Sequence, residues 1–525
     1  MSQASDNIEA NRLSLQAALD GQKTQAQRNR LGQFATPTAL ARDVLAYGLA
    51  LIPKSRPVRF LDPAIGTGSF YAALQESGRR IDSASGFEID HHYGAPAIEL
   101  WKDTPLQITM GDFTQSVAPR SDTDKATLLI CNPPYVRHHH MGGPEKLRLH
   151  ARAKETAQIN LSGLSGLYCY FMALSHEWMA DDGIAGWLIP SEFMDVNYGR
   201  KLKEYLLREV TLLHIHRFDP NDVQFDDALV SSAVVWFRKT KPPADHSVKF
   251  SYGGSLAAPA LVKEISVADL QRADKWTRFP KNDPAADYNG YRLADLFAIK
   301  RGLATGDNSF FIVDEDRAKE LDLPARFLRP VLPSSRYIKE DEVFADAQGI
   351  PLLAKRQFLI DCNIPEHEIR RDYPSLWSYL ETGLETVAMA YICKSRKYWY
   401  AQERREAAPI ICTYLGRSDH ARRPFRFLLN HSRAAATNVY LMLYPQPILA
   451  AQLALNPNAI RELWQALNAI NPETLLGNGR VYGGGLHKLE PRELANVPAD
   501  DMAVIVGLLP KRARHQLELL EEVAA

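Results

Sequence analysis

The chain has 525 residues, 46% of them hydrophobic and 24% charged, and its formal net charge is zero. This length exceeds what one hydrophobic core usually organises, so we expect two or three domains, and the composition excludes extensive disorder. The five cysteines form no CxxC pair, which excludes a disulfide framework and a zinc ribbon and fits a reducing, cytoplasmic compartment. The N-terminus is polar and no stretch approaches 18 apolar residues, so we expect neither export nor a membrane span.

From Val58 onward, short β-rich runs alternate with helical patterns. The runs are VRFLD (58–62), SGFEID (85–90), QITMGDF (107–113), TLLICNPPY (127–135) and GIAGWLIP (183–190), and helices are expected from Ser69, over 168–179 and over 200–209. This alternation predicts an α/β domain with a mostly parallel, Rossmann-like sheet. The next two runs, TLLHIHRF (211–218) and VSSAVVWF (230–237), are expected to form an antiparallel hairpin at the edge of that sheet.

The run KTKPPA (239–244) carries two prolines directly after an expected strand. Prolines interrupt pairing and are typical of linkers, so we expect one domain over residues 1–243 and a second over 244–525. The second part loses the regular alternation and mixes short strands, turns and Arg-rich helices. We expect an α+β fold there, and pattern reasoning does not determine its arrangement.

The loop DPAIGTGSF (62–70) follows an expected strand and opens a helix. Gly66 and Gly68 allow a tight turn and a close approach of the backbone to a ligand, although a plain strand-to-helix turn also uses small residues. Glu88 lies twenty residues past Gly68, at the end of the next strand, where it could bind ribose hydroxyls. This spacing favours a nucleotide-type site.

Three acidic residues, Asp62, Glu88 and Asp112, stand at the ends of successive expected strands. Open α/β sheets bind ligands at this edge, so the three carboxylates could each serve a different ligand group. Such an edge would repel the phosphates of NAD. It would accept a cationic nucleoside without phosphate, such as S-adenosylmethionine.

The fourth strand runs into Asn132, Pro133, Pro134 and Tyr135. Two consecutive prolines remove backbone donors and stiffen the turn. The Asn132 side-chain oxygen and the Pro133 carbonyl can together accept two hydrogen bonds from an exocyclic amine, and Tyr135 offers a ring for stacking. The motif therefore predicts an amine-recognition site, although a rigid surface turn could carry the same four residues.

Basic residues concentrate between Tyr391 and Tyr440, where ten of them stand against three acidic residues, a net charge of +7. Aromatic residues interleave with them, which is typical of surfaces that meet phosphates and bases. Taken alone, the segment fits a solvated basic face equally well. The candidate DNA contacts are Arg396, Lys397, Arg404, Arg405, Arg422, Arg423 and Arg426.

With these motifs in this order, the chain resembles the gamma-class N6-adenine DNA methyltransferases of bacterial restriction–modification systems, with a TaqI-like catalytic domain. GQFATP (32–37) is similar to the family's N-terminal cofactor motif, DPAIGTGSF to its glycine loop and NPPY to its catalytic motif. Similarity extends to Leu188–Pro190 and to Phe225, where the family has a second aromatic. GLATGDN (302–308) and YGGGL (482–486) look like parts of target-recognition regions.

The resemblance implies direct transfer of a methyl group from S-adenosylmethionine to N6 of an adenine flipped out of duplex DNA, leaving S-adenosylhomocysteine. Asn132 and Pro133 would hold the amine, and Tyr135 and Phe225 would stack on the base. The implied cofactor pocket comprises Thr36, Pro37, Asp62, Ala64, Gly66, Gly68, Glu88, Ile89, Asp112, Phe113 and Asn132.

The same resemblance implies a site-specific modification enzyme of the bacterial cytoplasm that partners with double-stranded DNA and with a separate restriction endonuclease for the same site. We expect a monomer with a target-recognition domain over residues 244–525. No metal is expected, because the adjacent His138, His139 and His140 point in different directions and lack a partnering Cys or carboxylate pattern.

Other methyltransferases share NPPY, namely those acting on guanine N2 of ribosomal RNA and on protein glutamine. They are usually compact, whereas this chain has a long, partly basic C-terminal region that favours DNA recognition. A fused nuclease is not expected, because only 31 residues precede GQFATP and no Asp/Glu-x-Lys triplet occurs. The remaining alternative is a non-catalytic DNA-binding specificity module.

Overall fold

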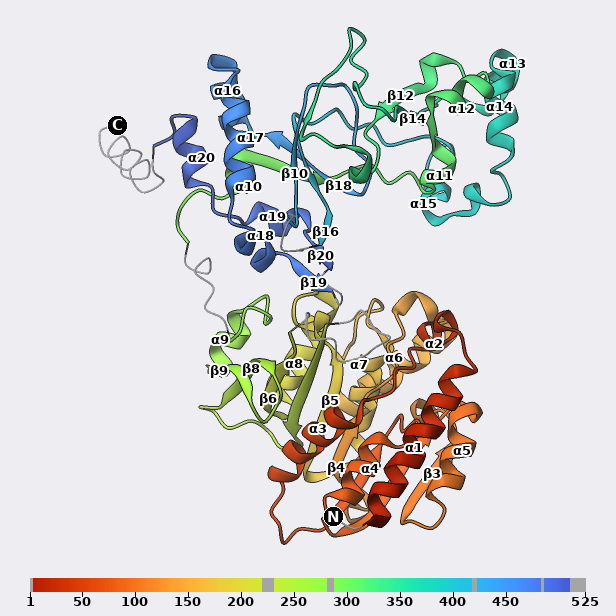
Figure 1. Ribbon diagram of the computed structural model, residues 1–525, viewed down its shortest axis with the longest axis vertical. Helices are drawn as coiled ribbons and strands as arrows, with labels where there is room; N and C mark the ends of the chain where they lie inside the picture. Colours follow the sequence, from red (N-terminus) through yellow and green to blue (C-terminus); the bar gives the residue numbers. More distant parts are fainter. Residues whose placement is uncertain (1–2, 220–230, 281–287, 418–422, 483–485, 510–525) are drawn as a thin grey trace. The chain divides into compact units, whose positions relative to one another are not determined.

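The computed structural model describes residues 3–219, 231–280, 288–417, 423–482 and 486–509. The chain forms two compact units, residues 1–283 and most of residues 284–525 (Figure 1). Among the helices of these described ranges, none has the length and apolar character needed to cross a membrane.

A nine-stranded sheet organises the first unit. Its strand order is β3-β2-β1-β4-β5-β7-β6-β8-β9. The bounds are β1 (Val58–Asp62), β2 (Ile81–Glu88), β3 (Leu106–Met110), β4 (Ala126–Cys131), β5 (Met179–Pro190), β6 (Thr211–Arg217), β7 (Ser232–Arg238), β8 (Ser247–Gly254) and β9 (Pro259–Ser266). Strands β1 to β5 pair in parallel, and β7 pairs antiparallel with both β5 and β6. The expected α/β class with a mostly parallel sheet is confirmed.

Two expectations about the end of this unit need correction. The hairpin of β6 and β7 is not at the sheet's edge, because β8 pairs in parallel with β6 and β9 pairs with β8. The expected boundary at 239–244 therefore falls inside the first unit, and the two units divide near Asp283. The two prolines mark only a turn before β8, since a short loop can contain prolines without ending a sheet.

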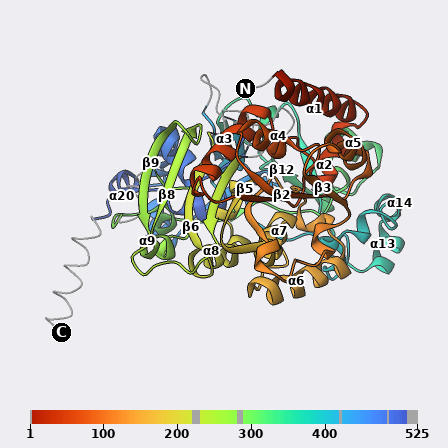
Figure 2. The same ribbon diagram turned by 90° about the horizontal axis from the view of Figure 1, so that it is seen from below.

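Helices cover both faces of this sheet (Figure 2). They are α1 (Gln3–Gly21), α2 (Gln25–Leu31), α3 (Thr38–Ala50), α4 (Ser69–Glu76), α5 (His91–Trp101), α6 (Gly143–Ala157), α7 (Leu167–Leu174), α8 (Arg200–Arg208) and, after β9, α9 (Val267–Arg272). Successive side chains of β5 alternate between two cores: Trp187 and Ile189 pack on one face, and Ile184 and Leu188 on the other. Central parallel strands buried on both faces account for the nearly continuous hydrophobic runs in the sequence.

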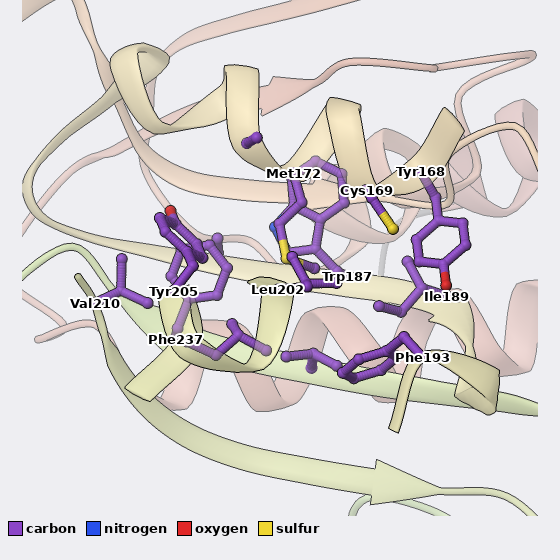
Figure 3. Close-up of a cluster of buried hydrophobic side chains, with 14 of the residues drawn as sticks. Tyr168, Cys169, Met172, Trp187, Ile189, Phe193, Leu202, Tyr205, Val210 and Phe237 are labelled. Carbon is purple, nitrogen blue, oxygen red and sulfur yellow. The ribbon is translucent and has the colours of Figure 1, made fainter. Parts of the chain in front are cut away.

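The core on one face is built largely from α7 and α8 against the strands (Figure 3). Cys169 and Met172 of α7 and Leu202 and Tyr205 of α8 gather with Trp187 of β5, all of them buried. Cys169 is thus a packing residue of this core.

The second unit is a mixture of small sheets and short helices. Its five-stranded sheet has the order β10-β18-β15-β17-β13, and two three-stranded sheets have the orders β11-β14-β12 and β16-β20-β19. The strands are β10 (Phe297–Arg301), β11 (Ile312–Asp314), β12 (Leu328–Val331), β13 (Glu342–Val343), β14 (Gln357–Ile360), β15 (Ile410–Thr413), β16 (Leu415–Arg417), β17 (Phe427–Asn430), β18 (Tyr440–Pro445), β19 (Arg480–Tyr482) and β20 (Leu486–Lys488). The expected α+β character is present.

Helices of this unit include several of only one or two turns. They are α10 (Leu293–Leu296), α11 (Asn308–Phe311), α12 (Glu315–Glu320), α13 (Glu366–Asp372), α14 (Pro374–Glu381), α15 (Tyr391–Lys394), α16 (Pro447–Leu455), α17 (Ala459–Ala469), α18 (Pro472–Asn478), α19 (Pro491–Ala495) and α20 (Asp500–Ile505). Such short elements carry little periodicity, which is why the sequence pattern did not reveal their arrangement.

Candidate active site

The site begins with three carboxylates at neighbouring strand ends. Asp62 ends β1, Glu88 ends β2, and Asp112 follows β3 by two residues. The strands are adjacent in the order β3-β2-β1 and run in parallel, so these residues lie along one edge of the sheet. This is the edge where open α/β sheets bind their ligands.

The glycine loop links the first two of these strand ends. The Ala64 amide donates to Asp62 Oδ1 over 3.1 Å, and the Gly66 amide donates to Glu88 Oε2 over 3.1 Å. Gly66 and Gly68 adopt φ values of 54° and 92°, which favour glycine. A Cβ on Gly68 would lie 2.7 Å from Trp101 Nε1, whereas none of the described atoms comes within 4 Å of a Cβ on Gly66. The backbone at Gly66 is therefore open to a ligand.

Burial raises the pKa of Asp62 to about 7, and the Ala64 amide and the Cys131 thiol only partly offset this effect. Burial likewise raises the pKa of Glu88, against hydrogen bonds from the Asp90 and Gly66 amides. Within the described ranges neither carboxylate has a Lys or Arg partner at ion-pair distance. A cationic ligand here would stabilise the charged form of both groups.

The other residues expected to bind the cofactor differ in how exposed their side chains are and in the contacts they already make. Ile89 follows Glu88 and is 67% exposed, so its side chain is free to pack on a ligand. Asp112 already accepts from the Thr114 amide and lies 3.4 Å from Arg148. Phe113 is only 2% exposed and packs edge-on against Phe87, so most of its ring lies in the core.

The NPPY turn lies next to this loop, because Cys131 at the end of β4 contacts Asp62. The Asn132 side-chain amide donates to the Phe34 carbonyl over 3.0 Å and to Thr36 Oγ1 over 3.1 Å. These two bonds orient the amide, so that its Oδ1 points away from them. No described residue donates to Asn132 Oδ1 or to the Pro133 carbonyl. Two acceptors are thus left free side by side in the sequence.

Contacts with the GQFATP segment hold Tyr135 in place. Its amide donates to the Gly32 carbonyl over 3.3 Å, and a Cβ on Gly32 would lie 2.3 Å from that nitrogen. The Tyr135 hydroxyl donates to the Leu188 carbonyl over 3.0 Å, and burial raises its pKa. The Phe34 and Tyr135 rings lie 5.7 Å apart at 43°.

Three other residues expected at the site are placed as follows. Pro37 is the N-cap residue of α3, Pro134 is half-buried, and Phe225 lies outside the described residues.

Helix α1 contributes to the site in a way that the sequence did not indicate. Arg12 is 1% exposed and bonds Glu9 through both carboxylate oxygens, at 2.7 and 2.8 Å. Its third nitrogen donates to Thr67 Oγ1 over 3.1 Å and to Ser69 Oγ over 3.0 Å. Arg12 therefore fixes the back of the glycine loop.

Residues that follow α1 in the chain contact the segment just past the end of β2. Lys23 pairs with Asp90, two residues past Glu88, and Gln33 donates to the same carboxylate over 2.7 Å. The Tyr93 hydroxyl donates to Asp20 Oδ1 over 2.8 Å. Residues 9–33 thus pack along the loop and strand end that form the candidate cofactor site.

The arginines expected to contact DNA are mostly engaged within the second unit. Arg396 donates to the carbonyls of Ala304 and Thr305, and Arg405 donates to the Arg301 carbonyl. Arg426 pairs with Asp341 at 2.6 Å, and Arg423 donates to the Asn468 carbonyl.

The structure also places most of the remaining residues and segments that the sequence analysis singled out. Lys397 and Arg404 are exposed without an ion pair in the described ranges, and Arg422 lies outside them. Arg396 holds the GLATGDN loop, whereas YGGGL falls largely outside the described residues. The histidines 138–140 form a short 3-10 turn, and no three potential metal ligands come together in the part of the chain that is described.

Comparison with known families gives two matches that lie one after the other. Residues 75–224 match the family model described as Eco57I restriction-modification methylase. Residues 283–520 match the C-terminal domain of Type II methyltransferase M.Eco57I. The second match begins where the two compact units divide.

Similar proteins align over nearly the whole chain. Type II methyltransferase M.XamI of Xanthomonas campestris pv. amaranthicola is 28% identical, over 89% of this chain and 84% of its own. Type II methyltransferase M.AccI of Acinetobacter calcoaceticus is 25% identical, over 93% and 88%. A solved structure of the restriction-modification enzyme MmeI in complex with DNA covers 85% of this chain and 63% of its own at 13% identity, with a TM-score of 0.49. The consecutive family matches and these relatives agree: over both of its units the chain is similar to the Eco57I-type restriction–modification methylases.

Proposed function

We propose that this protein transfers a methyl group from S-adenosylmethionine to N6 of an adenine flipped out of double-stranded DNA. The observation that carries the proposal is the pair of free acceptors at Asn132 Oδ1 and the Pro133 carbonyl. An exocyclic amine has two hydrogens to donate, so this pair matches it. The neighbouring Tyr135 is held through its amide and its hydroxyl, and its ring would stack on a base.

The strand ends support S-adenosylmethionine as the cofactor. Asp62 and Glu88 are buried carboxylates without a cationic partner in the described ranges, which suits a positively charged ligand without phosphate. Glu88 lies where ribose hydroxyls would be held, and the exposed Ile89 beside it offers an apolar face for an adenine ring. The open backbone at Gly66 allows a close approach.

In the proposed reaction the protein acts mainly by positioning. When bound, S-adenosylmethionine supplies a methyl group on a cationic sulfur that a neutral amine can attack directly. Asn132 and Pro133 accept the two amine hydrogens and so aim the nitrogen lone pair, while Tyr135 stacks on the base. Phe225 is the expected second aromatic. The gain in stacking of about 1–3 kcal/mol per aromatic roughly offsets the cost of unstacking the adenine.

We further propose that the first unit is catalytic and that the second selects the target sequence. As a modification enzyme, the protein would act beside a separate endonuclease for the same site, and we expect it to work as a monomer. The test is to express the chain in a host without DNA methylation and to sequence its DNA with long reads. N6-methyladenine in one sequence motif is the expected result. Modified cytosine, or a methyl group found only in RNA or protein, would contradict the proposal.

The pKa of Asp62 leads to a prediction about cofactor affinity. At about 7, this pKa leaves the carboxyl partly protonated at neutral pH. A cationic cofactor favours the carboxylate and lowers the pKa, so binding releases a proton and affinity rises with pH. Below pH 7 the affinity should fall by up to about tenfold per pH unit.

Calorimetric titration of the full chain with S-adenosylmethionine between pH 6 and pH 8 measures this dependence. Asp62→Asn is the control, because the amide does not titrate and should flatten the profile. Any remaining slope would come from Glu88, whose pKa is also raised. Equal affinities at both ends of the range in the unmodified protein would refute the assigned contact.

A further inference from the structure

An exposed apolar surface stands out in the second unit, at the turn before α15 and on α15 itself. Met389, Tyr391 and Ile392 are 58%, 87% and 40% exposed. Together with the exposed Lys394 and Lys397 they form what we call the Tyr391 surface. Three large apolar side chains exposed within four consecutive positions are unusual, and such groups commonly mark a binding surface.

The backbone under the Tyr391 surface is firmly held. Cys393 is buried, and a Cβ on Gly306 would lie 2.5 Å from its sulfur. The Lys394 amide donates to the Ala390 carbonyl over 3.0 Å. The Arg396 guanidinium donates to the carbonyls of Ala304 and Thr305, each over 2.8 Å, which ties α15 to the loop before α11 (Figure 1). The exposed side chains therefore project from a fixed scaffold.

The charge of this surface is positive. Residues 386–402 contain Lys394, Arg396 and Lys397 but no Asp or Glu. No carboxylate of a described residue lies within ion-pair distance of Lys394 or Lys397. Arg396 is occupied by carbonyls of its own unit, so Lys394 and Lys397 are the basic side chains of segment 386–402 that remain available to phosphates.

We propose that the Tyr391 surface contacts duplex DNA, with Lys394 and Lys397 at phosphates and with Tyr391, Met389 and Ile392 against the groove. This inference rests on the proposed function in DNA modification. Lysine is depleted in protein–protein interfaces, whereas lysines beside exposed apolar side chains suit a DNA groove and its phosphates. Binding of a protein partner at this surface is the competing outcome.

The test measures the affinity of the full chain for duplex DNA that carries its methylation motif, at several salt concentrations. The double variant Lys394→Gln/Lys397→Gln should lower the slope of log affinity against log salt by about 2, because each phosphate contact contributes about 0.9. Tyr391→Ala should weaken binding about tenfold or more without changing the slope, since it removes an uncharged contact. Thermal unfolding should be unchanged, because all three side chains are exposed.

Lys339→Gln/Lys355→Gln is the matched control in the same unit. Neither lysine has an ion pair within the described ranges, and Lys355 lies over Tyr337 on other loops. An unchanged slope in the Lys394/Lys397 variant, or an equal loss in the control, would overturn the proposal. Normal DNA binding with loss of a protein partner would also overturn it. If the unmodified chain bound no duplex DNA at all, the proposed function itself would fail.

Discussion

Asn132→Ala will reduce the rate of methyl transfer by roughly 100-fold or more, with little change in the binding of cofactor or DNA. The alanine removes the Oδ1 acceptor that would hold one amine hydrogen, while the pocket walls stay in place. The measurement is single-turnover transfer of a labelled methyl group to duplex DNA, together with the two binding constants. Asn160→Ala is the matched control, because Asn160 is exposed and bonds only His150 among the described residues.

A second substitution separates the two roles of the Asn132 amide. Its nitrogen donates to the Phe34 carbonyl and to Thr36 Oγ1, and its oxygen is free. Asn132→Asp keeps an acceptor but places a charged oxygen against the Phe34 carbonyl, so the side chain should lose its orientation. We expect this variant also to lose most of its activity. Full activity of Asn132→Ala on duplex DNA would refute the proposed mechanism.

Much of the first unit could be predicted because each site motif directly follows its strand in the sequence. The glycine loop, Glu88 and NPPY follow successive buried strands, and parallel pairing of those strands necessarily brings their ends to one edge. The continuation of the sheet through β8 could not be foreseen in this way. It depends on pairing with β6, more than thirty residues earlier in the chain, while the prolines just before β8 indicated a boundary.

The partners of the arginines in the second unit could not be predicted from the sequence either. Their clustering along the chain is visible, but whether a guanidinium faces solvent depends on carbonyls far away in sequence. Arg396 is held by residues 91 and 92 positions earlier, and Arg426 by Asp341. A run of positive charge therefore predicts a basic segment but does not identify the side chains that remain free for phosphate.

Arg12→Met will destabilise the first unit by about 3 kcal/mol, because it leaves the Glu9 carboxylate buried without its cation. Burial alone would raise the pKa of Glu9, yet hydrogen bonds from Arg12 and Thr38 outweigh it and hold this pKa below its usual value. The loss should lower the melting temperature of the unit by roughly 5–10 °C. Differential scanning calorimetry of the full chain measures it.

The double variant Glu9→Gln/Arg12→Met separates a buried charge from a lost packing contact. Removing both charges abolishes the unpaired carboxylate, so much of the stability should return. The Thr67 and Ser69 hydroxyls would still lack the Arg12 donor, and the glycine loop would lose its support. We therefore expect the double variant to bind S-adenosylmethionine more weakly than the unmodified chain despite its recovered melting temperature. If affinity returned together with stability, Arg12 would hold the fold without positioning the loop.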